Sequence, residues 1–158
     1  MFSIDRLVPG FDRALAAIPG GVEMARVLGD SADDGVLPSR TAALIRVAVA
    51  QRAAGPYARW VMSRMAARQS VRSEDIFFAT MGTARDPVEA VIMKAVTQMA
   101  TTGRRTSPTD FDALARTLGS PKATEVVAQV ALAMLACEAL SAIAPSTASE
   151  PSRRGAQQ

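Results

Sequence analysis

The chain has 158 residues, of which 49% are hydrophobic and only 4% aromatic, and its formal net charge at pH 7 is +3. This length predicts one domain that can bury a core without disulfides or metals, with Ala, Val, Leu and Met filling its interior. The sequence contains no histidine and a single cysteine, Cys137. It therefore excludes an imidazole base, a Ser-His or Cys-His couple, an intramolecular disulfide and a Cys-based zinc site within this chain, and we expect neither a metal nor a cofactor.

Proline, glycine and capping residues divide the chain into helical segments. Ser39 is a plausible N-cap, Gly55-Pro56 breaks one long helix and begins the next, Asp86-Pro87 begins another, and Gly119 ends a short one. We expect helices, in chain order, over residues 11–18, 22–28, 40–54, 56–69, 73–81, 87–101, 111–118 and 122–143. No segment alternates apolar and polar residues as a half-buried strand does, so the predicted fold class is all-α, a compact helical bundle.

The composition also predicts the domain limits and the location of the protein. Residues 1–144 form the expected single domain, with its core at 37–143, and the Ser-, Thr-, Pro-, Arg- and Gln-rich residues 145–158 form a disordered tail. Residues 1–18 carry too many polar and helix-breaking residues for a secretory signal. Residues 126–144 approach the length of a membrane span, but Glu138 in the middle favours a helix buried in protein. We therefore expect a cytoplasmic protein that does not enter a membrane.

The stretch from Leu37 to Ile76, LPSRTAALIRVAVAQRAAGPYARWVMSRMAARQSVRSEDI, predicts two long helices joined by a tight Gly-Pro turn. In this layout the chain resembles the carboxymuconolactone decarboxylase and alkylhydroperoxidase D-like superfamily. A helix after Asp86-Pro87, a short SPTDFDALARTLG segment and a long apolar final helix follow in the order usual for that family. The resemblance covers roughly residues 37–143 and implies an alkylhydroperoxidase D-like helical bundle.

The reactive residues of that family are replaced in this chain. Its members usually carry a Glu on the first helix, then Cys-x-x-Cys, then a His four residues after the second Cys. The Glu position is Ala43 here, the two Cys positions are Gly55 and Ala58, and the His position is Met62. A thiol relay needs a thiolate, a resolving thiol and proton-transfer groups, and none of these four residues supplies one. The decarboxylase branch relies on acid-base groups, commonly including His, and this chain has no acidic residue between Asp34 and Glu74.

The predicted function is therefore that of a catalytically degenerate relative, a homo-oligomeric structural or small-ligand-binding protein without thiol peroxidase activity. The family commonly forms trimers or hexamers, which the resemblance extends to this chain. Two alternatives stay open at this point. One is an enzyme with altered, Cys- and His-independent chemistry in the same pocket. The other is a partner subunit of an active paralogue.

Four residues are candidates for ligand binding: Arg46, Tyr57, Arg59 and Met62. They predict a small pocket for an apolar or anionic ligand, floored by Met62 and gated by Tyr57 and Arg59. The alternative is that these side chains, together with Trp60, simply fill the space of the replaced residues, because Met is a common filler of irregular gaps in cores.

The remaining predictions concern the arginines of residues 40–72 and the single cysteine. Seven arginines and no acid occur between residues 40 and 72, and Arg64, Arg68 and Arg72 are expected to share one helix face by their spacing. The segment has no nucleic-acid-binding motif, so we expect no nucleic-acid partner but a solvated face, or pairing with acids elsewhere such as those at residues 30, 33 and 34 across a subunit interface. Cys137 is expected to be a small buried hydrophobe, and Glu138 either pairs with an arginine or faces solvent.

Overall fold

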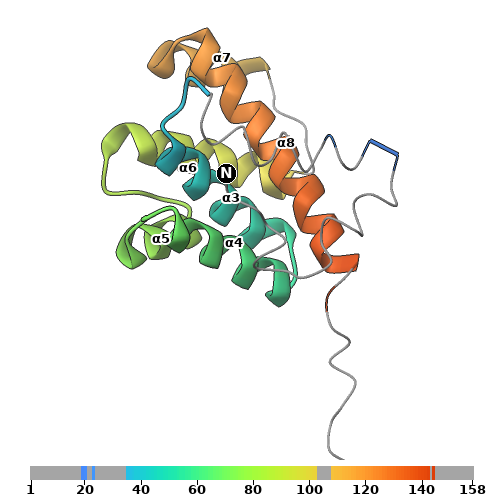
Figure 1. Ribbon diagram of the computed structural model, residues 1–158. Coiled ribbons are helices and arrows are strands. Elements are labelled where there is room, and N and C mark those ends of the chain that lie inside the picture. Colours follow the sequence, from blue (N-terminus) through green and yellow to red (C-terminus); the bar gives the residue numbers. More distant parts are fainter. Residues whose placement is uncertain (1–18, 21–22, 24–34, 103–107, 143, 145–158) are drawn as a thin grey trace, which may run out of the picture.

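The computed structural model describes residues 19–20, 23, 35–102, 108–142 and 144. These residues form helices and turns and contain no strand, which confirms the all-α prediction. The helices are α3 (Ser39–Ala53), α4 (Pro56–Arg68), α5 (Ser73–Thr80), α6 (Pro87–Thr101), α7 (Pro108–Leu118) and α8 (Ser120–Ala142) (Figure 1). The predicted helices over 11–18 and 22–28, apart from helical Glu23, and the tail over 145–158 lie outside the described residues.

Helix α3 is the central element of the bundle. Every residue from Thr41 to Ala50 is buried, and α3 packs against α4, α5, α6 and α8. In Figure 1, α7 lies at one end of the molecule and α4 and α5 lie at the other. A helix that is apolar around its whole circumference is stable only when other elements cover all its sides. The run TAALIRVAVA meets this condition, because its small alanines let neighbouring helices approach closely.

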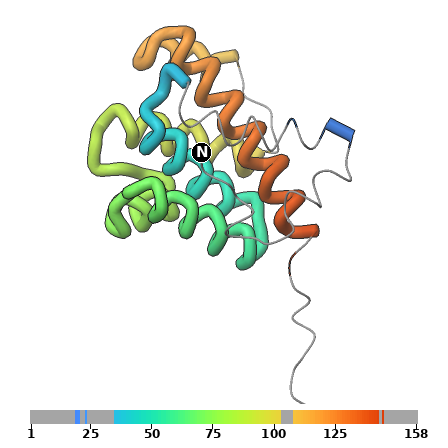
Figure 2. Tube along the Cα trace, viewed as in Figure 1, coloured from blue at the N-terminus to red at the C-terminus, as the bar shows by residue number. Residues whose placement is uncertain are grey.

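The interior consists of two apolar clusters. The larger one joins residues of α3, α6, α7 and α8, including Ile45, Met93 and Val126. The smaller one lies where the end of α3 meets α4 and the second half of α8, and it contains Met62 and Cys137. Helix α8 therefore contributes to both clusters, and Figure 2 shows it crossing the molecule as the long orange-to-red helix that follows α7.

The helix boundaries agree with the sequence-based expectation within a few residues, but one predicted cap is wrong. Ser39 is the first residue of α3, whose N-cap is Pro38 and carries no side-chain cap hydrogen bond. Asp86 caps α6 as expected, because its Oδ1 accepts a hydrogen bond from the Glu89 N–H at 2.9 Å. Gly119 separates α7 from α8 with a φ of +83°, a conformation that glycine adopts without steric cost.

Helices α7 and α8 begin earlier than predicted, at Pro108 and Ser120 instead of residues 111 and 122. A proline fits the first turn of a helix because its missing N–H would have no partner there. Pro108 and Ser120-Pro121 therefore lie in the first turns of α7 and α8.

The expected arginine face on α4 is also corrected. Arg64 and Arg68 lie on α4 and are exposed, but Arg72 lies beyond its end, as the N-cap of α5. Between them Ser70 has a φ of +61°, which turns the chain out of the helical path. The i, i+4, i+8 spacing therefore does not place the three arginines on one helix.

Among the described helices, α8 alone is long and apolar enough to cross a bilayer by length and composition, with a mean hydropathy of 1.6 over its most apolar window. Half of that window is buried inside the protein, and a core helix of a globular domain has the same properties. The expectation of a cytoplasmic protein stays a prediction.

Candidate functional site

Two buried carboxylates share one arginine at the point where the first turns of α3, α5 and α6 meet. Arg40 on α3 donates through Nη1 to Glu89 Oε1 at 2.5 Å, and its Nη2 lies 3.1 Å from Asp75 Oδ2. Only 2% of the Asp75 side chain and 10% of the Glu89 side chain are exposed, against 41% for Arg40. Asp75 and Glu89 are each the third residue of their helix, where the positive end of the helix dipole favours a negative charge.

A second arginine completes this charge cluster. Arg72 Nε donates to Asp75 Oδ2 at 3.0 Å. The hydrogen bond from Arg72, followed by that from Arg40, outweighs desolvation and holds the pKa of Asp75 below its ordinary value. For Arg40, desolvation acts in the opposite direction to its two carboxylate partners, which prevail and raise its pKa. The cluster therefore joins two arginines to two carboxylates through hydrogen bonds and ion pairs.

One oxygen of Glu89 has its hydrogen-bonding capacity filled and the other does not. Glu89 Oε1 accepts from Arg40 and also from the Thr41 hydroxyl at 3.0 Å. Glu89 Oε2 is buried and accepts no hydrogen bond in the part of the chain that the structure describes. A buried acceptor without a donor costs about 1–3 kcal/mol, so any donor that reaches this oxygen is stabilised there.

Glu89 lines a cavity of about 310 Å³ between the start of α3, the start of α6 and the junction of α7 with α8. Its apolar walls are formed by Leu37, Pro38, Val88, Ile92 and Leu118. Its polar lining consists of Arg40, Thr41, Asp86, Glu89 and Lys122. A mostly apolar cavity of this volume with a few convergent polar groups is typical of a small-ligand site.

The segment before α3 forms one wall of this cavity and is held by α8. The Leu37 N–H donates to Glu125 Oε2 at 2.8 Å. A Cβ at Gly35 would collide with Glu125 Oε1, so with the carboxylate in this position the backbone can approach it this closely only at a glycine. The Glu125 carboxylate thereby fixes the position of Leu37 at the cavity wall.

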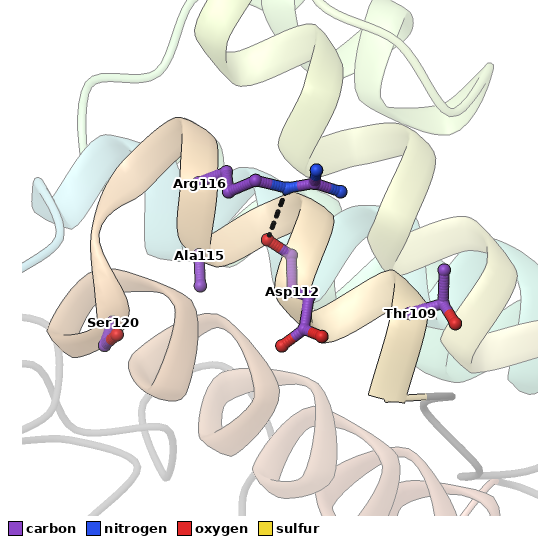
Figure 3. A pocket seen from close by; sticks show the side chains of 5 residues that line it. All are labelled: Thr109, Asp112, Ala115, Arg116 and Ser120. Atoms are coloured by element: carbon purple, nitrogen blue, oxygen red, sulfur yellow. Dashed lines mark hydrogen bonds between the residues drawn. The ribbon is translucent and has the colours of Figure 1, made fainter.

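A second, larger hollow of about 510 Å³ lies along α7 and is lined by Thr109, Asp112, Ala115, Arg116 and Ser120 (Figure 3). Arg116 Nε donates to the backbone carbonyl of Asp112 at 3.3 Å, the bond drawn in Figure 3. Four of the five lining residues are exposed and Ala115 is half-buried. This hollow therefore offers solvated side chains, in contrast to the buried carboxylate of Glu89.

The four ligand-binding candidates predicted from the sequence line neither of these two cavities. Arg46 is buried inside the bundle, where its Nη2 donates to Gln129 Oε1 on α8 at 3.3 Å and burial lowers its pKa. Arg59 is exposed, and its Nε donates to the Ala54 carbonyl at 2.8 Å, at the end of α3. Arg46 thus joins α3 to α8, whereas Arg59 joins α4 to the end of α3.

Met62 is buried in the smaller apolar cluster, and the partly buried Tyr57 packs against that cluster. The Tyr57 ring stacks on Trp60 with their centroids 6.2 Å apart and their planes 21° apart. These contacts are those of packed side chains. The pocket predicted around the four candidates stays a prediction.

The four positions that the predicted resemblance aligns with reactive residues lie in different parts of the fold. Ala43 lies in the larger cluster, Ala58 and Met62 lie in the smaller one, and Gly55 is exposed in the turn between α3 and α4. Cys137 is buried in the smaller cluster, which confirms its predicted role as a small hydrophobe. Burial and, to a lesser degree, the charge of Glu138 raise the pKa of this thiol to about 12.

The sequence-based reasoning missed Asp75 and Glu89. Each occupies the third position of a helix, a pattern typical of exposed capping residues. Arg40 and Arg72 pair with Asp75 and Glu89, which lie in the same chain, and pairing of arginines across a subunit interface stays a prediction. The acids at residues 30, 33 and 34 lie outside the described residues.

Comparisons with protein-family models, with curated proteins and with solved structures found no match. Within the described ranges, no group of three or more His, Cys, Asp or Glu could hold a metal ion. Function must therefore be inferred from the chemistry of the site itself.

Proposed function

We propose that this protein binds a small molecule in the cavity beside Glu89 and carries out no thiol chemistry. The observation that carries the proposal is the Glu89 carboxylate, which is buried and has one oxygen that accepts no hydrogen bond among the described residues. Folding removes that oxygen from water at a cost, and a ligand with a suitable polar group offsets the cost on binding. The apolar walls supplied by Leu37 and Ile92 provide the remaining affinity.

The part of the proposal that excludes thiol chemistry is supported by the burial of Cys137 and by the raised pKa of its thiol. A nucleophilic thiol must be accessible and must ionise near neutral pH. Cys137 is 2% exposed and its pKa is raised to about 12, so the thiolate is scarce and cannot meet a substrate. It is also the single cysteine of the sequence, so no resolving thiol exists within the chain.

The proposal includes a relationship to the alkylhydroperoxidase D-like bundle and a homo-oligomeric state, trimeric or hexameric. The relationship is supported by the order of helices α3 to α8 and by the tight Gly55-Pro56 turn. Oligomerisation is supported by Trp60, Phe77 and Met81, each more than half exposed, because large apolar side chains at the surface are commonly covered by a partner subunit.

Native mass spectrometry of the full chain, purified gently from its source, tests both parts of the proposal. We expect an oligomer that retains a small molecule, and we expect Val88→Trp to abolish that retention by filling the cavity mouth. Val91→Trp is the matched control, because Val91 lies on the same helix with similar exposure, 41% against 47%, and does not line the cavity. Loss of the molecule in Arg59→Ala but not in Val88→Trp would place the site in the pocket predicted from the sequence and contradict the cavity beside Glu89.

A further inference from the structure

The charges around the cavity balance one another. Arg40 and Arg72 pair with Asp75 and Glu89 in one hydrogen-bonded cluster, in which the two carboxylates are buried and the two arginines are exposed to solvent. At the cavity lining, Lys122 and Asp86 add one further charge of each sign, and both are exposed. A charged ligand beside Glu89 would disturb the pairing between the buried carboxylates and their arginines.

The Glu89 carboxylate requires a hydrogen-bond donor from a ligand and not an acceptor. Glu89 Oε1 is occupied by Arg40 and Thr41, and the remaining oxygen, Oε2, is an acceptor only. Two of the apolar residues that line the cavity, Val88 and Ile92, lie on the same helix as Glu89. A ligand that presents a second acceptor to Oε2 would leave two lone pairs facing each other, whereas a hydroxyl or amide N–H would fill the unmet acceptor.

Resting on the proposed function, we propose that the cavity selects a neutral, mainly apolar molecule that carries a hydroxyl or N–H donor, and that Glu89 Oε2 receives this donor. An anion is disfavoured by the adjacent carboxylate. An ammonium ion competes with Arg40 for the same carboxylate and must lose its own hydration in an apolar cavity. The selective group is thus Glu89, a residue that recognises the ligand without reacting with it.

Three probes with one ring framework test the ligand class: cyclohexanol, cyclohexanone and the cyclohexylammonium ion. Binding is measured by NMR titration of the full chain at pH 7, following the backbone amides of Leu37 and Ile92. We expect cyclohexanol to bind at least about tenfold more tightly than cyclohexanone, because the ketone leaves the buried acceptor unmet, and more tightly than the ammonium ion.

Glu89→Gln provides a reversal test. The amide oxygen keeps accepting from Arg40 and Thr41, since an amide NH₂ turned towards these donors would be repelled. The amide nitrogen then takes the place of Oε2 and offers a donor, so cyclohexanone should gain affinity relative to cyclohexanol. Glu74→Gln is the matched control, because Glu74 is an exposed carboxylate of α5 that pairs with Arg85. The Glu74→Gln variant should prefer cyclohexanol over cyclohexanone to the same degree as the wild type.

The outcomes separate the ligand class from the proposed function. The proposed ligand class is wrong if cyclohexanol and cyclohexanone bind equally tightly, if the ammonium ion binds more tightly than cyclohexanol, or if the preference for the alcohol does not reverse in a folded Glu89→Gln chain. In each of these cases the cavity still binds a small molecule, so the proposed function stands. If none of the probes binds and Val88→Trp leaves a co-purified molecule in place, the proposed function itself fails. The wild-type comparison alone decides the donor requirement, so a Glu89→Gln chain that does not fold leaves the inference testable.

Discussion

Arg40 Nη1 lies 2.5 Å from Glu89 Oε1, although 49 positions separate the two residues in the sequence. The same guanidinium holds Asp75 through its other terminal nitrogen. Arg40 therefore ties α3 to both α5 and α6, and its hydrogen bond to Oε1 leaves Oε2 as the Glu89 oxygen without a partner among the described residues. The stability of this end of the bundle and the chemistry of the candidate site depend on one side chain.

Replacing Arg40 by methionine should destabilise the protein, because Asp75 and Glu89 would stay buried with fewer donors. We expect a loss of about 2 kcal/mol in the free energy of unfolding, below the full value for a buried pair because Arg40 is 41% exposed. Urea unfolding followed by circular dichroism measures the change. Arg85→Met is the control, since Arg85 pairs with the exposed Glu74 and should cost less than about 1 kcal/mol. Equal losses in the two variants would contradict a special role for Arg40.

The lowered pKa of Asp75 predicts a stability that falls in acid. A depressed pKa means that the folded state favours the ionised carboxylate, so this contribution is present above the unfolded-state pKa of about 3.9. It is lost as the pH falls through the lower pKa of the folded state. Asp75→Asn should reduce the slope of unfolding free energy against pH below about pH 4 by up to about 1.4 kcal/mol per pH unit.

Arg72→Met offers a second test of the same carboxylate, because Arg72 is the largest cause of the lowered pKa. The slope of the unfolding free energy against pH below about pH 4 should decrease in Arg72→Met. It should stay unchanged in Arg68→Met, which alters an exposed arginine at the end of α4. A slope that is identical in the wild type and in Asp75→Asn would show that Asp75 does not contribute to acid unfolding.

The close approach between Gly35 and Glu125 predicts an energetic coupling. The Cβ of an alanine at Gly35 would collide with Glu125 Oε1, so we expect the carboxylate to move away and the Leu37 N–H to lose its acceptor. We expect Gly35→Ala to cost about 1–2 kcal/mol in the wild type and far less in a Glu125→Ala background. A double-mutant cycle from urea unfolding measures the difference, and additive losses would mean that the two residues do not interact.

The raised pKa of Cys137 predicts an inert thiol. A shift from 9.0 to about 12 lowers the thiolate fraction at pH 8 by about a thousandfold, and burial also hinders access. Ellman's reagent should therefore leave the native protein unmodified at pH 8 over a period in which the urea-unfolded chain reacts completely. Rapid modification of the folded chain would show that the smaller cluster opens and would weaken the case against thiol chemistry.

Local signals in the sequence were enough to place the described helices. Proline at Pro56 and Pro87, the Asp86 cap and glycine at Gly119 act on the backbone within a few residues, so their effect does not depend on the rest of the fold. Ser39 shows the limit of such reasoning. A side chain with capping chemistry stands one residue inside α3, and the choice between neighbouring positions depends on how the preceding segment packs.

The candidate site was not predictable in the same way. The predicted resemblance drew attention to Arg46, Tyr57, Arg59 and Met62, whereas the cavity beside Glu89 is lined by other residues, among them Arg40 and Thr41. An arginine-rich segment without acids indicates that partners are needed, but it does not indicate which carboxylates are brought to it.

Composition and periodicity alone establish an all-α chain without histidine or paired cysteines, with α3 apolar enough to be covered on every side. These properties follow from local backbone preferences and from the hydrophobic effect, which act on each segment separately. The meeting of Arg40 with Asp75 and Glu89 depends instead on the relative positions of three helices. Those positions are set by packing between segments far apart in the chain, so the acceptor that remains at Glu89 is a property of the assembled bundle.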